Sequence, residues 1–263
     1  MALAHAHIRL LLDIRRLGLT GSGKTNSILE FGEQNWFGDV APAALGELIE
    51  SSTLSVASKM ELSAALASAL GNTSGAALFD IAKIFYHLIF EHQSYMAVDL
   101  HGTPAAHKLD INEPLPIEDR FDVVTNIGTT EHVFNQYQAF KSIHELTRPK
   151  GLMIHSLPNQ GCFDHGFYNY HPTFFFDLCE ANGYELPVFV YADAMQTPNK
   201  IVQLHTRADY VRLAIAKQLS PYSGLFLVAK KGESDTPFKI PRQGYYDNRL
   251  PEDLAAAWRN LPR

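Results

Sequence analysis

The sequence predicts an α/β fold in which helices cover both faces of a mostly parallel, doubly wound sheet. Short apolar runs alternate along the chain with longer segments of helical periodicity, and this alternation is typical of such a sheet. The run 27–32 ends in an acid and a glycine, and the run 94–99 also ends in an acid. Two buried parallel strands with these endings are typical of a Rossmann-like sheet that holds a nucleoside. Of the 263 residues, 46% are hydrophobic and 19% are charged, so the chain can bury a core.

The N-terminal part of the chain is expected to contain one strand and several helices. Charged residues interrupt the apolar run at 4–17 every few positions, which indicates an amphipathic helix. A linker rich in glycine, serine and threonine at 18–26 then leads into the first strand at 27–32. Residues 41–92 have helical character, and we interpret about 41–72 as a helical insertion after the first strand.

The rest of the chain alternates between strands and helices. A proline at the first turn and Gly183 past the end delimit a helix at 172–182. The strands are expected at 94–99, 107–110, 121–126, 151–157, 184–191 and 224–230, and the other helices at 135–147 and 207–219. We expect one Rossmann-like domain over 1–232 and a C-terminal surface arm, rich in proline and polar residues, over 233–263.

Charge and cysteine content exclude several classes of protein. The net charge of −6 and the lack of a basic stripe argue against nucleic acid as a partner. The two cysteines, Cys162 and Cys179, cannot build a disulfide framework and indicate reduced thiols in a cytoplasmic protein. The charged N-terminal helix matches neither a signal peptide nor a membrane span, so no membrane partner is expected. A small molecule or another protein remains the expected partner.

The segment before the first predicted strand contains a phosphate-binding motif. Residues 18–25 read GLTGSGKT and match the phosphate-loop pattern G-x-x-x-x-G-K-[ST]. That loop binds phosphates because a strand precedes it and a helix follows, so that backbone N–H groups and the helix N-terminus converge. Here a helix precedes the motif and a strand follows it. We therefore interpret the segment as a linker, and a nucleotide-hydrolysing enzyme is not favoured.

Several segments, in the right order, resemble the motifs of class I S-adenosylmethionine-dependent methyltransferases. The resemblance covers about 27–192 and implies a Rossmann-like fold with methyltransferase activity. The segments that carry it read ILEFG at 28–32, VD at 98–99, LDI at 109–111, FDVVTN at 121–126 and LTRPKGL at 146–152.

The resemblance implies that S-adenosylmethionine is the cofactor, and it assigns residues to each part of that molecule. Asp99 would accept hydrogen bonds from both ribose hydroxyls, Asp110 would take the exocyclic amino group of adenine, and Ile111 would pack on the adenine ring. The remaining implied cofactor residues are Glu30 and Gly32 at the methionine end, and Asn126 and Gly128 below the sulfonium.

The loop after the first strand departs from the family pattern. Gln34 and Trp36 occupy the positions of the second and third glycines of the usual G-x-G-x-G loop. Their side chains would either crowd the backbone or contact the cofactor carboxylate through amide and indole N–H groups. We therefore count both as cofactor residues that reshape the methionine end. The alternative is a non-catalytic scaffold or interaction protein with a degenerate cofactor site.

The segment 126–132 follows a predicted strand, where open α/β sheets place their ligands. His132 could accept the proton of an acceptor hydroxyl, with Glu131 or a backbone group fixing its tautomer. The alternative is that His132 caps or packs the start of the next helix.

A loop rich in imidazoles and aromatic rings follows the strand at 151–157. Such a loop suits one wall of an acceptor pocket. Its sequence, HGFYNYHPTFF at 165–175, is similar to methyltransferases of surface-glycan and small-molecule pathways. A metal site built from the histidines of this loop and Asp164 is an alternative, but no fixed metal-ligand spacing is present, so no metal is predicted. The candidate substrate-binding residues are His155, His165, Tyr168 and His171.

The sequence thus predicts methyl transfer to an oxygen, with nitrogen as the second choice, of a small polar molecule that could be sugar-like. A nicotinamide-dependent oxidoreductase would need the G-x-G-x-x-G turn that this chain lacks. The segment 77–90 is apolar on nearly every face, which indicates burial or a subunit contact. The apolar helices at 54–70 and 76–90 could form a lid over the acceptor, or a homodimer contact through the helical insertion.

Overall fold

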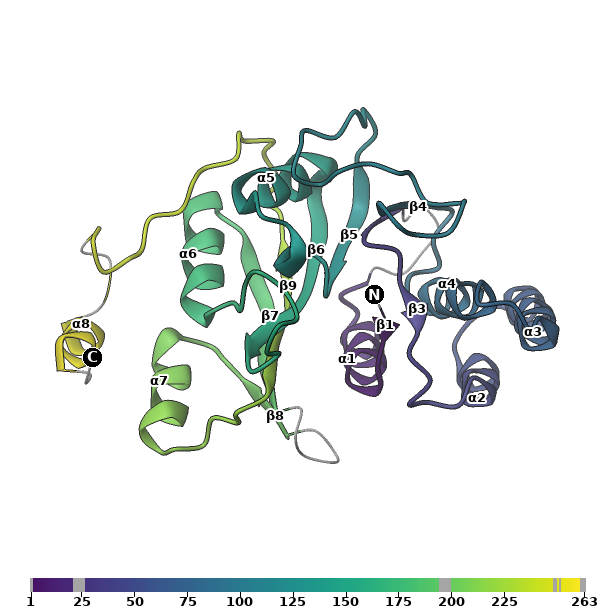
Figure 1. Ribbon diagram of the computed structural model, residues 1–263, viewed down its shortest axis with the longest axis horizontal. Helices are drawn as coiled ribbons and strands as arrows, with labels where there is room; N and C mark the ends of the chain where they lie inside the picture. Colours follow the sequence, from purple (N-terminus) through teal and green to yellow (C-terminus); the bar gives the residue numbers. More distant parts are fainter. Residues whose placement is uncertain (1, 21–26, 194–199, 248–249, 251, 261–263) are drawn as a thin grey trace.

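The computed structural model describes residues 2–20, 27–193, 200–247, 250 and 252–260. A seven-stranded sheet runs through it in the order β4-β2-β5-β6-β9-β7-β8 (Figure 1). Its strands are β2 (Ser27–Phe31), β4 (Ser94–Val98), β5 (Phe121–Ile127), β6 (Thr147–Gln160), β7 (Glu185–Asp193), β8 (Lys200–Gln203) and β9 (Ser223–Lys230). A second, two-stranded sheet pairs β1 (Ala2–Leu3) with β3 (Asn35–Trp36).

Four neighbouring strands of the large sheet run in the same direction. β4, β2, β5 and β6 pair in parallel, with Ile28 of β2 between Tyr95 of β4 and Val123 of β5. β9 runs antiparallel to β6 and β7, and β8 runs antiparallel to β7. The expected mostly parallel sheet is confirmed. The carboxyl ends of the parallel strands meet at one edge, where open α/β sheets bind ligands.

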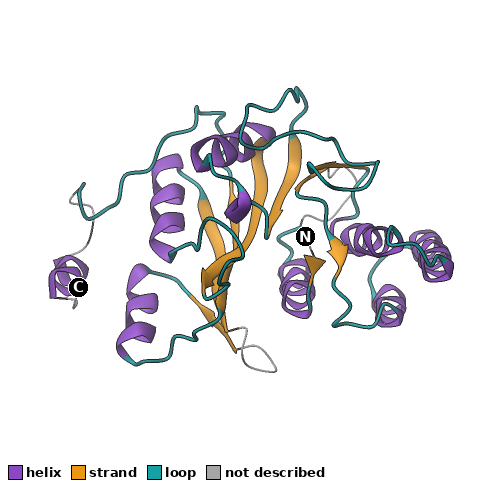
Figure 2. Cartoon of the chain, in the orientation of Figure 1, coloured by secondary structure: helices purple, strands orange, loops and turns teal. Residues whose placement is uncertain are grey.

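Helices cover both faces of this sheet, as Figure 2 shows. One face carries α1 (His5–Arg16), α2 (Ala43–Ser51), α3 (Val56–Gly71) and α4 (Ala77–Phe90), and the other carries α5 (Gln136–Leu146), α6 (Pro172–Asn182) and α7 (Arg207–Ile215). Successive strand residues face opposite sides. Ile28 and Val123 therefore join the core under α1–α4, whereas Leu29 and Val124 join the core under α5–α7. The doubly wound arrangement is confirmed.

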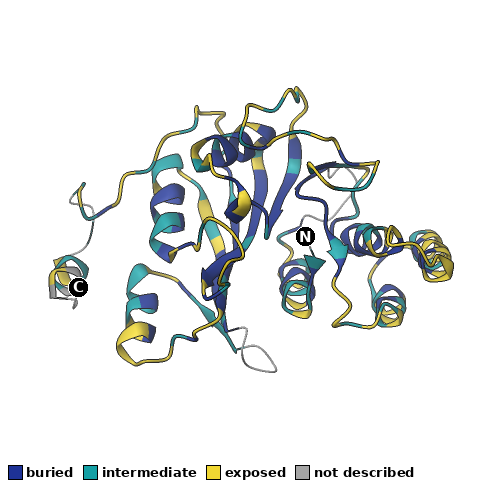
Figure 3. Cartoon of the chain, viewed as in Figure 1, coloured by how far each residue is buried: buried dark blue, intermediate teal, exposed yellow. Residues whose placement is uncertain are grey.

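The helices α2 and α3 lie within 41–72, the range that the sequence marks as an insertion. α3 packs on α4, and α4 packs on β3. Because α4 is covered from both sides, nearly all of its faces are buried, which explains its apolar sequence. The outer side of α3 is exposed (Figure 3), including Val56 and Met60.

Some elements differ from the prediction. Residues 107–110 form no strand; in their place a single parallel bridge joins Val98 to His107. Leu109 N donates a hydrogen bond to His107 O, so the chain turns directly after this bridge. The sequence did not predict β1, β3, β8, the short 3-10 helix η1 (Thr130–His132) or α8 (Glu252–Asn260). Most of the predicted linker, 21–26, lies outside the described residues, and so does the end of the phosphate-loop motif.

The segment after β9 runs along α5 and α6. Thr236 O lies 2.7 Å from His144 Nε2 of α5, and Lys239 N donates to Asn182 Oδ1 of α6. The last helix, α8, lies away from the sheet (Figure 1). Among the described residues, no helix combines the length and hydrophobicity that a membrane span requires.

Candidate active site

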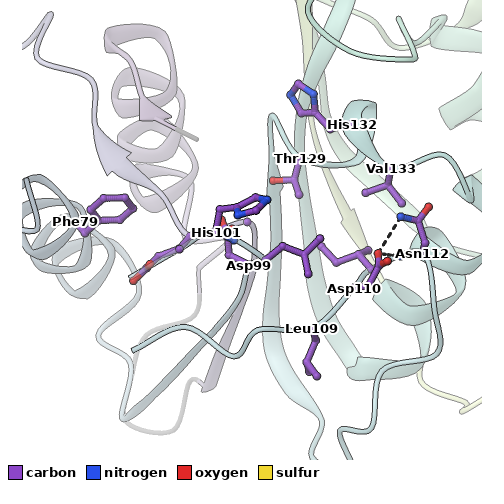
Figure 4. A pocket seen from close by; sticks show the side chains of 14 residues that line it. Phe79, Asp99, His101, Leu109, Asp110, Asn112, Thr129, His132 and Val133 are labelled. Carbon is purple, nitrogen blue, oxygen red and sulfur yellow. Dashed lines mark hydrogen bonds between the residues drawn. The ribbon is translucent and has the colours of Figure 1, made fainter. Parts of the chain in front are cut away.

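Two cavities open at the edge of the sheet where the parallel strands end. The smaller cavity has a volume of about 340 Å³ and lies among the ends of β2 and β4, the segment 109–112 and the turn after β5 (Figure 4). The larger cavity, of about 920 Å³, lies between the N-terminal segment with α1 and the ends of β5 and β6.

The turn at Gly32 gives the smaller cavity one of its walls. Gly32 has φ +79°, a conformation that favours glycine, and its N–H donates to Val98 O of β4. A Cβ at this position would overlap the hydroxyl of Thr129, which donates a 2.6 Å hydrogen bond to Phe31 O. Glycine is therefore required here, and the backbone of the turn stays open to the cavity.

Asp99, directly after β4, is fixed by backbone hydrogen bonds. Its Oδ1 accepts from His101 N at 2.7 Å, and its Oδ2 accepts from Glu33 N at 2.9 Å. Each carboxylate oxygen retains a further lone pair. The half-buried carboxylate can therefore accept two more hydrogen bonds from the cavity.

The segment 109–112 forms the opposite wall. Asp110 Oδ1 accepts from both the backbone N and the side-chain Nδ2 of Asn112, as the dashed line in Figure 4 indicates for the side chains. Ile111 is 6% exposed and joins the core beside Val133. A carboxylate next to an apolar surface can bind a flat ring with an amino group.

Glu33 was not predicted as a site residue, yet it lines the smaller cavity. Its side chain has no exposed surface and forms an ion pair with Lys83 of α4 at 2.9 Å. It also accepts hydrogen bonds from the backbone and hydroxyl of Thr103. Burial alone would raise the pKa of Glu33, but these partners hold it below its ordinary value. Glu33 thus fixes the loop after β4 to α4.

η1 lies between the two cavities. His132 lines the smaller cavity, and Glu131 lines the larger one together with His165. The His132 and His165 rings lie 4.8 Å apart, and His165 Nε2 lies 3.8 Å from Glu131 Oε1. Burial raises the pKa of Glu131 to about 7, and its Oε2 has no hydrogen-bond partner. Partial burial and the neighbouring His165 lower the pKa of His132. We call these three residues the η1 cluster.

The comparison with known families decides what kind of protein carries this site. A family model described as a methyltransferase domain matches residues 69–214, more than half of the chain. The chain belongs to the methyltransferase domain family. It is a class I methyltransferase, and S-adenosylmethionine is its cofactor.

Three solved structures to which this methyltransferase is similar are distant from it in sequence. The N-methyltransferase NodS from Bradyrhizobium japonicum, in complex with S-adenosylhomocysteine, is 12% identical over 86% of this chain and 87% of its own, with a TM-score of 0.41. The 1,6-didemethyltoxoflavin-N1-methyltransferase from Burkholderia thailandensis is 17% identical over 86% and 78%, with a TM-score of 0.37. TehB from Haemophilus influenzae is 9% identical over 85% and 62%, with a TM-score of 0.42. No curated protein matches the chain.

The residues of the smaller cavity fit the cofactor of a methyltransferase. Gly32 leaves backbone exposed beside it, and Asp99 keeps two free acceptor positions for the paired hydroxyls of a ribose. Asp110 and Ile111 supply the carboxylate and the apolar surface that an adenine ring can use. Four of the nine predicted cofactor residues therefore line one cavity, together with the predicted base His132.

Two other predicted cofactor residues, Glu30 and Gln34, lie behind the turn. Alternation along β2 directs Glu30 toward α4, where it accepts hydrogen bonds from Tyr95 OH and Gln34 N. Burial raises the pKa of Glu30 to about 7. Gln34 Nε2 donates to Gly32 O and Ile127 O, so the amide joins the ends of β2 and β5. Neither residue lines the smaller cavity.

Trp36 lies farther from the smaller cavity. Its side chain is fully buried, it packs edge-on against Phe85, and its Nε1 donates to Val40 O. Because β3 pairs with β1, the chain leaves the smaller cavity directly after Glu33. The second and third glycine positions therefore do not face that cavity, and Trp36 instead lines the larger one.

Asn126 and Gly128, the last two predicted cofactor residues, do not line the smaller cavity either. Asn126 is buried, and its side chain exchanges hydrogen bonds with Thr130, which holds the start of η1. Gly128 has φ +69° and lines the larger cavity. Asn126 therefore supports the site from behind.

Of the four predicted substrate-binding residues, His165 alone lines the larger cavity. His155 points to the opposite face of β6, between Phe140 and Phe175, where burial lowers its pKa to about 3. Tyr168 donates its hydroxyl to Phe134 O, and His171 precedes α6 against Tyr210. These three side chains line neither cavity.

Proposed function

We propose that this methyltransferase transfers the methyl group of S-adenosylmethionine to an oxygen of a small molecule held in the larger cavity. The observation that carries the proposal is that the short helix η1 lines both cavities, with His132 in the smaller one and Glu131 in the larger one. The smaller cavity has four of the predicted cofactor residues, and the larger one has room for a second molecule. Small-molecule sites are typically concave and mostly apolar, with few polar groups.

The cofactor supplies a methyl group activated by its sulfonium charge, and the protein mainly has to align an acceptor with it. We propose that Gly32, Asp99, Asp110 and Ile111 hold the cofactor. Glu30 and Gln34 would act on it through the Gly32 turn, since both contact that turn or the residues beside it.

We propose His132 as the group that accepts the proton of the acceptor hydroxyl. Its lowered pKa keeps the imidazole neutral, the form that accepts a proton. A hydroxyl needs a base to take its proton as it attacks the methyl group, whereas a neutral amine can attack with its lone pair before it loses a proton. A neutral imidazole at this place therefore favours oxygen over nitrogen as the acceptor atom. Nitrogen stays the second choice.

The lining of the larger cavity guides the choice of acceptor. Apolar side chains, including Leu10, Trp36 and Leu157, supply much of its wall, and polar residues such as His7, Asp39, Glu131 and His165 supply the rest. This lining favours an acceptor with a mostly apolar skeleton that carries a hydroxyl. The sugar-like acceptor expected from the aromatic loop is the second candidate.

The first test is calorimetric titration of the full chain with S-adenosylhomocysteine, with magnesium–ATP and NAD as controls. We expect binding of S-adenosylhomocysteine only. Lack of binding would favour the non-catalytic scaffold. Acceptors with single hydroxyl or amino groups on apolar skeletons, and simple sugars, can then be screened with labelled cofactor. We expect His132→Gln to lower kcat about 100-fold or more while S-adenosylhomocysteine affinity changes little.

A homodimer through the insertion is a further proposal from the sequence. Val56 and Met60 lie four positions apart on α3 and are 75% and 69% exposed. Light scattering of the wild type and of Met60→Glu tests it: a dimer that becomes a monomer in the variant supports the contact, and a monomeric wild type contradicts it.

A further inference from the structure

The η1 cluster brings together a carboxylate and two imidazoles from separate parts of the chain. One ligand atom from each of Glu131, His132 and His165 lies within 4.8 Å of the others. We propose that these three residues bind a divalent transition-metal ion, such as Zn²⁺, at the junction of the two cavities. Two histidines and one glutamate are a donor set that holds zinc while leaving a position open for another ligand.

The Glu131 carboxyl is buried and lacks a full set of partners, which favours a bound cation. The residue is 1% exposed, and its Oε2 has no hydrogen-bond partner. Among the described residues, the basic group found within ion-pair distance of this carboxyl is His165. A buried carboxylate without a full partner is costly, and a bound cation would supply the missing interaction.

The backbone already holds the three donors close together. Phe167 N and Tyr168 N both donate to Glu131 O, so the loop that carries His165 is fixed to η1. Gly166 makes this approach possible, because a Cβ there would lie 2.9 Å from Glu131 O. Ligand atoms around a tetrahedral zinc are about 3.3 Å apart, given bond lengths near 2.0–2.1 Å. From the present distances of up to 4.8 Å, the donor atoms would have to draw together by up to about 1.5 Å around the ion.

The position of the cluster suggests what the ion would do. Glu131 and His165 face the larger cavity and His132 the smaller one, so an open coordination position would lie near the acceptor. A cation there makes a bound hydroxyl more acidic. The methyl group passes from sulfur to oxygen, and the proton passes to solvent. This role of the ion rests on the proposed function, whereas the binding of the ion does not. When the His132 imidazole is a metal ligand, the ion takes the place of His132 as the group that makes the acceptor hydroxyl reactive.

Metal binding can be measured without cofactor or acceptor. The full chain is freed of metal with a chelator and titrated with Zn²⁺ by calorimetry and with Co²⁺ by visible absorption. We expect one ion per chain and d–d bands of a low-coordinate cobalt site. Glu131→Gln and His165→Gln should each weaken binding more than about 100-fold, because loss of even a second-shell partner costs 10–100-fold. His205→Gln, a change at an exposed imidazole on another loop, should bind like the wild type.

The outcomes separate this proposal from the proposed function. A wild type that binds no ion, or variants that bind as tightly as the wild type, would overturn the metal site. Circular dichroism establishes that each variant is folded, and His165 is exposed, so its substitution leaves the core intact. If the ion binds but S-adenosylhomocysteine does not, the metal site stands and the proposed function fails.

Discussion

Glu33 and Lys83 form an ion pair, with 2.9 Å between Oε1 and Nζ, that joins the turn after β2 to helix α4. The same carboxylate accepts two hydrogen bonds from Thr103, and Glu33 N donates to Asp99. One buried acid thus connects three separate segments around the smaller cavity. The position of Asp99 therefore depends on a lysine in a distant helix.

Lys83→Met should destabilise the protein by about 3 kcal/mol, because it leaves a buried carboxylate without its cation. Urea unfolding measures this change. Lys141→Met is the control, since Lys141 forms an exposed pair with Glu145 and its loss should cost less than about 0.5 kcal/mol. The pKa of Glu33 is lowered in the folded protein, so the pair stabilises the fold above the ordinary glutamate pKa and loses this effect as pH falls. A difference between wild type and Lys83→Met that persists in acid would contradict the argument.

Glu30 should have the opposite pH dependence. Its pKa is raised from 4.5 to about 7 by burial, so the folded state keeps a proton that the unfolded state loses in this range. The contribution of Glu30 to stability is therefore full below pH 4.5 and falls by up to about 3 kcal/mol as pH rises to 7. Glu30→Gln should remove this decline, and the exposed change Glu118→Gln should not. Unfolding curves at pH 5 and pH 8 provide the measurement; parallel declines in wild type and Glu30→Gln would rule the effect out.

Asp99→Ala should weaken S-adenosylhomocysteine binding by about 1–3 kcal/mol, because a ribose would lose a charged acceptor. Asp119→Asn is a matched exposed change outside the cavity and should leave affinity unaltered. Calorimetry of both variants is the test. An affinity for Asp99→Ala equal to that of the wild type would remove this residue from the cofactor site.

Gly32→Ala should destabilise the fold by about 2 kcal/mol or more, since the new methyl group overlaps Thr129 and the backbone keeps a positive φ. Thr129→Ala removes the overlapping atoms. In a double-mutant cycle, the two changes together should therefore cost less than the sum of the single changes. Additive costs would show that overlap with Thr129 is not the reason for the glycine.

The sequence predicts features that depend on neighbouring residues better than those that depend on distant ones. The bounds of α6 agree with the prediction, because its proline and glycine are local signals. Gly32 and Asp99 are predicted from strand-end patterns and Asp110 from the family resemblance, and all three line one cavity. No local signal connects Glu33 with Lys83, fifty residues apart. Likewise, the two-residue pairing of β1 with β3 is too short to be read from a pattern, and it decides where Trp36 lies.

The histidines also show which side-chain positions can be predicted from the sequence and which cannot. His155 belongs to a strand, so its direction follows from the alternation that places Ile154 under α1–α4. His132 and His165 meet only because a loop returns to η1, which spacing along the chain does not reveal. A metal was therefore not predicted from the sequence, and the proposal depends on the folded arrangement.

The N-terminal segment formed by β1 and α1 lines the larger cavity only. Ala2, Ala4, Ala6 and Leu10 line the larger cavity, and none of them lines the smaller one. Under the proposed function, these residues would admit or reject the acceptor, and they can be exchanged without changing the residues that line the smaller cavity. Libraries confined to this short segment are accordingly a direct way to broaden or redirect what the enzyme accepts.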